Sequence, residues 1–238
     1  MAVIHRTTIT PGKLELVARW LPRRPWYRGN GRPHLRKAGG FRLDDPVGEV
    51  GLEFMVVTDQ SGEVVVAYDV PVTYRGAPLP GAEGALIGTS EHGMLGRRWV
   101  YDGAHDPVLI NQLFDLLRGR TQPQAQSASN TPDESVVVDP VGANTFSIAR
   151  FTVDDGADSS DIVLEGTDGA GSAQQAVVRL IRILQSTDDR PRPDTTAPTA
   201  SVNAGWTLPD GSVGRGQFVR LMQPTRSSGY VATATVPD

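Results

Sequence analysis

Two long runs of alternating apolar residues, separated by a short polar turn, constrain this 238-residue chain most strongly. Residues 49–58 place an apolar side chain at every second position, as a strand with one buried face does. After a polar turn at 59–62, residues 63–74 alternate in the same way. The spacing predicts a long antiparallel hairpin. Pro71 interrupts the second run, so we expect that strand to lie at a sheet edge or to carry a bulge.

Two stretches have the period of an amphipathic helix. Thr10 and Pro11 provide an N-cap and a first helical residue, and apolar residues follow at helical spacing. Asp106 and Pro107 open a second helix in the same way, and Gly119 is a natural end for it. We therefore expect one helix before the hairpin and one helix after it along the chain.

These elements predict an α+β fold, in which an antiparallel sheet is covered by two amphipathic helices, for residues 1–120. A polar linker at 120–134 follows, and beyond it we find only strand-like segments. The predicted organisation is a first domain at 1–120 and a mostly β segment at 121–223 with a mobile loop at 185–199. A tail at 224–238 follows. The formal charge is +2 before residue 121 and −6 after it, which favours a boundary there.

The composition narrows the class of protein. The chain has no cysteine, which excludes disulfides and thiolate metal sites. It has neither a signal-peptide pattern nor a long apolar run, so we expect a cytoplasmic protein that does not enter a membrane. The formal net charge of −4 argues against nucleic acid as a partner.

Two groups of aromatic and basic residues are candidates for ligand binding. Trp26 and Tyr27 lie within an arginine-rich stretch at 19–42, where guanidinium groups could bind anions and rings could stack on sugars. Arg97, Trp99 and Tyr101 share one face of a predicted strand and could form a carbohydrate platform. In both groups the alternative is ordinary packing of arginine and aromatic side chains.

Acidic and histidine residues suggest two further sites, neither of which we expect to exist. Glu53 and Asp69 could form a carboxylate pair for glycoside chemistry. A metal would need ligands from a scattered set with no helical spacing, namely Glu91, His92, Asp102, His105 and Asp106. We therefore predict no metal and no cofactor.

Three segments of the first half resemble the cap of bacterial maltokinases, which phosphorylate maltose for α-glucan synthesis. They are ITPGKLELVARWLPRRPWYRG, the hairpin VGLEFMVVTDQSGEVVVAYDVPVTYRGAPL, and ALIGTSEHGMLGRRWVYDGAHDPVLINQLFDLL. The most specific shared motif is Gly-x-x-Trp-Val-Tyr-Asp, followed by Asp-Pro and a predicted helix. This resemblance implies a maltokinase cap-like domain over roughly residues 1–120.

A fainter resemblance extends to the kinase N-lobe. Residues 126–131 resemble the family's Gln-Ser-Asn-Thr turn, and Arg179 takes the place of the family's nucleotide-contacting lysine. If nucleotide binds, the resemblance assigns Ser127, Asn130, Thr131 and Arg179 to it. The family's catalytic aspartate and Mg²⁺ ligands lie in a helical lobe, and we find no such pattern after residue 182, so we predict no catalytic residues.

The resemblance therefore implies a non-catalytic binding or regulatory module, linked to maltose, trehalose or α-glucan metabolism. Its partner would be another protein of that metabolism, or a sugar or anionic ligand. Two alternatives remain open: the nucleotide-binding part of a split sugar kinase, and a carbohydrate-binding module.

Overall fold

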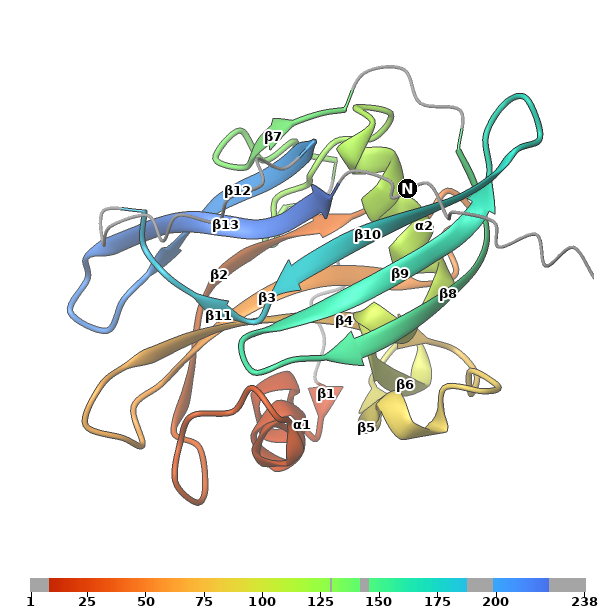
Figure 1. The fold of residues 1–238 in the computed structure, drawn as a ribbon. Helices are drawn as coiled ribbons and strands as arrows, with labels where there is room; N and C mark the ends of the chain where they lie inside the picture. The colour runs from red at the N-terminus through yellow and green to blue at the C-terminus, as the bar shows by residue number, and fades with distance from the viewer. Residues whose placement is uncertain (1–8, 129, 142–145, 188–198, 223–238) are drawn as a thin grey trace, which may run out of the picture.

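The computed structural model describes residues 9–128, 130–141, 146–187 and 199–222. In this part of the chain, thirteen strands form one antiparallel sheet, against which α1 (Lys13–Trp20) and α2 (Pro107–Leu117) pack (Figure 1). The strands are β1 (Ile9–Thr10), β2 (Leu35–Leu43), β3 (Gly51–Asp59), β4 (Val66–Arg75), β5 (Leu86–His92), β6 (Gly96–Asp102), β7 (Val137–Asp139), β8 (Ser147–Asp155), β9 (Ser159–Thr167), β10 (Ala173–Ile181), β11 (Ile183–Leu184), β12 (Ala200–Thr207) and β13 (Val213–Met222). Residues 1–8, most of the loop predicted at 185–199 and the tail predicted at 224–238 lie outside the described residues.

The predicted α+β fold class is wrong. Strands hold 48% of the residues and helices only 14%, so the protein is mostly β. One sheet contains strands from both halves of the chain, and β12 pairs with β2 where Trp206 lies opposite Gly39. Alternation in a sequence identifies single strands, but the partner of each strand depends on packing between distant segments. The division into domains near residue 120 stays a prediction.

The predicted hairpin is confirmed, because β3 pairs with β4 from Gly51 to Asp59. However, β4 is a central strand. On its other side it pairs with β11 at residues 67–68 and with β6 at residues 72–75. Pro71 falls in the interval between these two partners, where its missing N–H removes no ladder hydrogen bond.

The short strand β11 closes part of the sheet into a ring. Ile183 and Leu184 pair with β4, and just beyond them the N–H of Thr187 donates to the carbonyl of Arg215 on β13 (2.8 Å). Because β4, β3, β2, β12 and β13 are neighbours in that order, β11 joins the last strand to the first. Strands β10, β9 and β8 extend the sheet from β13, and β6, β5 and β1 extend it from β4 (Figure 1).

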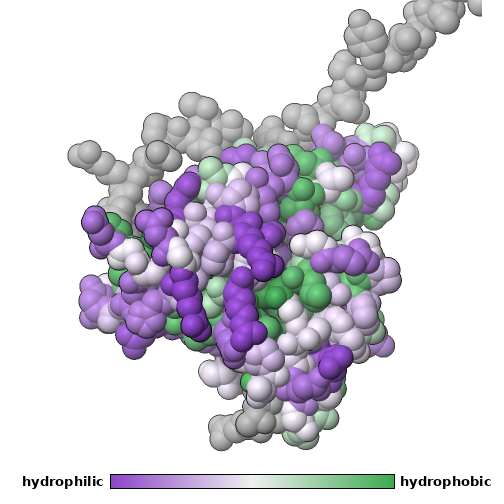
Figure 2. All heavy atoms as spheres, turned by 90° about the horizontal axis from the view of Figure 1, so that it is seen from below, coloured by the Kyte–Doolittle hydropathy of each residue, from purple (hydrophilic) through white to green (hydrophobic). Residues whose placement is uncertain are grey.

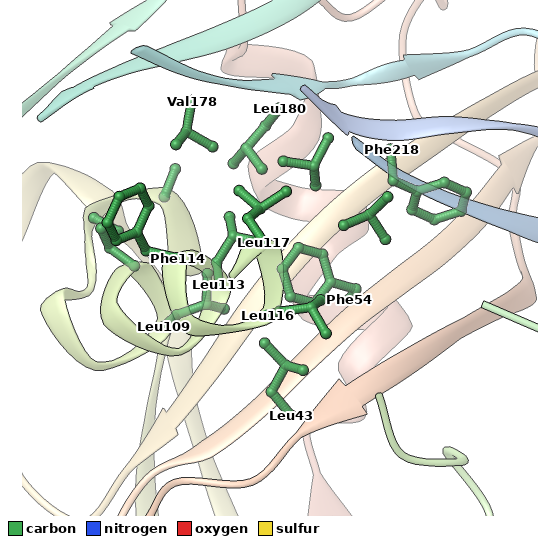
Figure 3. Close-up of a cluster of buried hydrophobic side chains, with 14 of the residues drawn as sticks. Leu43, Phe54, Leu109, Leu113, Phe114, Leu116, Leu117, Val178, Leu180 and Phe218 are labelled. Atoms are coloured by element: carbon green, nitrogen blue, oxygen red, sulfur yellow. The ribbon is translucent and has the colours of Figure 1, made fainter. Parts of the chain in front are cut away.

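Helix α2 packs on the inner face of this ring. As predicted, Asp106 is its N-cap, accepting the N–H of Val108 over 2.9 Å, and Pro107 is its first residue. Its apolar side chains, with Leu113 at their centre, meet side chains from four strands (Figure 3). Those partners are Leu43, Phe54, Val178, Leu180 and Phe218. Burial of each such side chain stabilises the fold by roughly 1.5–3 kcal/mol.

Helix α1 covers the opposite face of the β3–β4 hairpin. Its buried residues Leu16, Val17 and Trp20 pack with Met55 and Val70 of the hairpin. The expected N-cap at Thr10 is wrong, because the helix begins at Lys13 with Gly12 as its N-cap. Both faces of the hairpin are therefore buried, and its polar residues must find partners inside the protein.

Candidate ligand-binding pocket

A pocket of about 740 Å³ opens at the end of the β3–β4 hairpin. Because the strand order is β5-β6-β4-β3-β2, the lining residues of β3 and β4 form a floor between a β2 wall and a β5–β6 wall. Figure 2, seen from below, shows strongly hydrophilic side chains beside hydrophobic surface on the side of the molecule that carries α1 and the β5–β6 hairpin. The volume lies within the range of small-molecule sites, roughly 300–1,000 Å³.

Glu53 is the central acid of the pocket and is only 3% exposed. The Nζ atoms of Lys13 and Lys37 lie 2.5 and 3.5 Å from its two carboxylate oxygens. The hydroxyl of Tyr74 and the amide of Gln126 donate to it over 2.7 and 3.0 Å. Burial raises the pKa of Glu53, but the lysines and the tyrosine hydroxyl outweigh burial, so its pKa is lowered. The carboxylate is therefore ionised at neutral pH.

The hydroxyl of Tyr74 is kept protonated by the same arrangement. Burial, followed by the charge of Glu53, raises the pKa of Tyr74 well above its ordinary value. The Nζ atom of Lys13 also lies 4.7 Å from the centre of the Tyr74 ring. The floor thus combines an ionised acceptor, a hydroxyl and an ammonium group within one small volume.

Arg42 attaches the neighbouring loop to the β2 wall. It lies directly across from Glu53 in the β2–β3 register. Its guanidinium donates to the carbonyls of Ala125 (3.1 Å) and Ala128 (3.4 Å) rather than to a carboxylate. These bonds fix the loop that carries Gln126 over the pocket floor.

The opposite wall carries Arg98 and His92. Arg98 donates to the carbonyl of Leu95 over 2.9 Å, and its buried Nε has no acceptor among the described residues. The Nδ1 atom of His92 accepts the N–H of Leu95 over 3.1 Å, so the neutral ring carries its proton on Nε2. Arg75, at the rim, is instead bound through two 2.6 Å hydrogen bonds to the buried Asp106.

The predicted candidates Trp26 and Tyr27 lie outside this pocket. Trp26 is fully buried, with its ring centre 5.7 Å from that of Trp20 and 5.9 Å from that of Tyr68. Tyr27 is partly buried and donates its hydroxyl to Asp59 over 3.2 Å. In this conformation the Trp26 ring offers no surface to a ligand.

The other predicted platform lies on the far face of β6 from the pocket. Arg97 is exposed and pairs with Glu91 over 2.9 Å, while Trp99 is partly buried. Tyr101 is buried, and its hydroxyl accepts the N–H of Leu79. Packing therefore covers one end of the row, and a carbohydrate role for its exposed end stays a prediction.

The residues assigned to nucleotide are divided between two places. Ser127, Asn130 and Thr131 are exposed near the loop that Gln126 anchors. Arg179 lies on β10 and forms a two-pronged ion pair with Asp161 of β9, at 2.7 and 2.8 Å. In the sheet, β2, β12 and β13 separate β10 from β3. Nucleotide binding stays a prediction.

The acidic candidates do not converge on one another. Alternation along the hairpin turns Glu53 and Asp69 to opposite faces of the sheet. Of the residues weighed as metal ligands, Glu91, Asp102 and Asp106 each bind an arginine. In the described ranges, no three histidine or acidic residues are grouped closely enough to hold a metal ion.

A second charged cluster is buried where β4 changes partner from β6 to β11. The guanidinium of Arg182, fully buried, donates to both oxygens of Asp102 (2.8 and 2.9 Å) and to the hydroxyl of Ser160 (2.7 Å). It also lies 5.0 Å from the Trp26 ring centre. Asp69 lies beside it with no hydrogen-bond partner for its carboxylate among the described residues, and burial raises its pKa well above its ordinary value.

Comparison with known families finds a match to one family model. Residues 20–106 match the family model of the maltokinase N-terminal cap domain, which confirms the resemblance over that span. No curated protein matches the chain. The matched residues include Arg42, Glu53, Tyr74 and Arg98 of the pocket. The pocket is therefore built largely from the part of the chain that resembles the cap.

Proposed function

We propose that this chain is a non-catalytic binding module, built on a maltokinase cap-like unit, and that its pocket takes a hydroxyl-rich saccharide. The observation that carries the proposal is the buried, ionised Glu53 on the pocket floor. This carboxylate holds the Lys13 ammonium, the Tyr74 hydroxyl and the Gln126 amide in place around the floor, and these three groups can bind sugar hydroxyls. Ile9 and Leu95, apolar lining residues that are partly exposed, supply the contact surface that sugar C–H groups need.

The metabolic setting is proposed from the family match. A cap named for maltokinase supports a place in maltose, trehalose or α-glucan metabolism, with a protein of that metabolism as partner, in the cytoplasm. Binding rather than catalysis is supported because the titratable side chains of the pocket are already bound to other protein groups. Lys13 and Lys37 hold Glu53 ionised, and backbone N–H groups occupy Nδ1 of His92.

Calorimetric titration with maltose, trehalose and glucose tests the proposal. We expect one of these sugars to bind at millimolar or lower concentration and to raise the melting temperature. Gln126→Ala should weaken that binding by about threefold to tenfold, because it removes a hydrogen-bonding group from the floor. Gln122→Ala, an exposed glutamine outside the pocket lining, is the matched control and should bind normally. If no sugar binds at millimolar concentration, the proposal is wrong.

A further inference from the structure

The positive charges that line the pocket exceed its negative charges. Four cationic side chains, Lys13, Arg42, Arg75 and Arg98, meet only two acids, Glu49 and Glu53. Lys13 is compensated by Glu53, and Arg75 by the buried Asp106 behind the wall. Arg42 and Arg98 have only backbone carbonyls as described hydrogen-bond acceptors, and a carbonyl does not neutralise a charge. Glu49, exposed near the mouth, is the one lining acid that remains.

Arg98 is the better placed of these two arginines to meet a ligand. It lies on the β5–β6 wall, across two strands from Glu53 in the sheet order. Its guanidinium rests against the backbone at Gly76, where a Cβ atom would be only 2.9 Å from Nη1. Because residue 76 has no side chain, the guanidinium can lie close to the backbone there. Its Nε donor still lacks an acceptor in the described structure.

His92 adds a second donor to the same wall. In the β5–β6 register, Ser90 is opposite Arg98 and His92 is opposite Gly96, so His92 is the diagonal neighbour of Arg98 on one face. Since Nδ1 of His92 accepts backbone N–H groups, its N–H donor is Nε2. A guanidinium and an imidazole N–H on one wall are suited to oxygen atoms that carry negative charge.

We propose that the saccharide taken by this pocket is phosphorylated, with its phosphoryl group held at the Arg98–His92 wall and its hydroxyls held by the groups that surround Glu53. This inference rests on the proposed function and specifies its ligand. A phosphate monoester carries a charge of about −2 at neutral pH and three acceptor oxygens, which suits the Arg98 guanidinium because no carboxylate compensates its charge. The ionised Glu53 repels the phosphoryl group. This repulsion favours the orientation in which the phosphoryl group lies at the Arg98–His92 wall and the sugar ring lies near Glu53.

The experiment compares glucose 1-phosphate and glucose 6-phosphate with glucose by calorimetric titration of the whole chain. We expect at least one sugar phosphate to bind about tenfold or more tightly than glucose. Arg98→Gln should reduce its affinity by about tenfold or more, to near that of glucose. Arg97→Gln is the matched control, because the adjacent Arg97 points to the other face of β6 and pairs with Glu91. Gly76→Ala, which displaces the Arg98 guanidinium, should weaken binding of the phosphorylated sugar more than binding of glucose.

The alternative outcomes separate this inference from the proposed function. If glucose and its phosphates bind equally, the phosphoryl site is wrong while the saccharide pocket stands. If neither glucose nor its phosphates bind, the inference is overturned, and the proposed function fails as well if maltose and trehalose do not bind. Equal losses in Arg97→Gln and Arg98→Gln would show a general charge effect and overturn the inference. AMP or inorganic phosphate binding as tightly as the best sugar phosphate would overturn it as well, because the saccharide would then contribute nothing.

Discussion

Replacing Arg182 by methionine should destabilise the protein strongly, because it breaks an ion pair that is buried on both sides. The substitution keeps an unbranched apolar side chain against Trp26 but removes the donors to Asp102 and Ser160. Asp102 would keep only the N–H of Ala104 as a described hydrogen-bond donor. A buried carboxylate would thus lose its counter-charge where no water reaches it.

The size of the effect follows from burial. Both partners are at most 1% exposed, so solvent cannot screen the loss. Removal of one partner from such a pair destabilises proteins by about 3–5 kcal/mol. Arg179→Met is the matched control. Arg179 lies near the end of β10, shortly before Arg182 in the chain, but its ion pair with Asp161 is about one third exposed. An exposed pair of this kind contributes roughly 0–1 kcal/mol.

Urea unfolding, followed by tryptophan fluorescence, measures both variants. The double variant Arg182→Met, Asp102→Asn should recover about 1 kcal/mol or more relative to Arg182→Met, because no unpaired charge remains. The reasoning is refuted if Arg182→Met loses no more stability than Arg179→Met, or if the second substitution recovers nothing.

Three further predictions concern the core and the buried acids. Leu113→Ala should lower the free energy of unfolding, measured by urea denaturation, by about 2–5 kcal/mol, because this side chain of α2 is buried against the ring of strands. A loss below about 1 kcal/mol would contradict this packing. The raised pKa of Asp69 means that the folded state holds a proton the unfolded state releases, so stability falls as pH rises above the ordinary value of 3.8. Asp69→Asn should therefore gain stability relative to the parent chain between about pH 4 and pH 8, and a constant difference across that range would count against it. For Glu53 the pH dependence of stability has the opposite sign, because its lowered pKa adds stability that is lost as pH falls through the folded-state pKa. In urea unfolding, the stability advantage of the parent chain over Glu53→Gln should therefore shrink below about pH 4. A stability advantage that grows below that pH would exclude this explanation.

Local signals in the sequence predicted local structure well. The β3–β4 hairpin follows from alternation, and the start of α2 follows from Asp106 and Pro107. Gly119, at φ +69°, has the left-handed conformation expected just after a helix. These features depend on neighbouring residues, which is why one segment of sequence suffices to predict them.

The pocket could be predicted only in part. Once the hairpin register is known, Glu53 and Tyr74 become diagonal neighbours on one face, which is a signal the sequence does contain. Lys13 and Gln126, however, reach Glu53 from segments far away in the chain. The burial of Trp26 could not be predicted from its own segment for a related reason, because Arg182, which lies over its ring, is far away in the chain.

The ring closed by β11 has a consequence for how this chain folds. Strand β4 meets one of its partners only when residues 183–184 arrive, and β2 meets β12 only near residue 206. During synthesis, β4 and β2 each keep an unpaired edge until most of the polypeptide has been made. Such long-range pairing slows folding and leaves hydrogen-bonding edges available to other chains. Fragments that stop before β11 should therefore aggregate during expression, whereas the chain of 238 residues pairs these edges of β4 and β2.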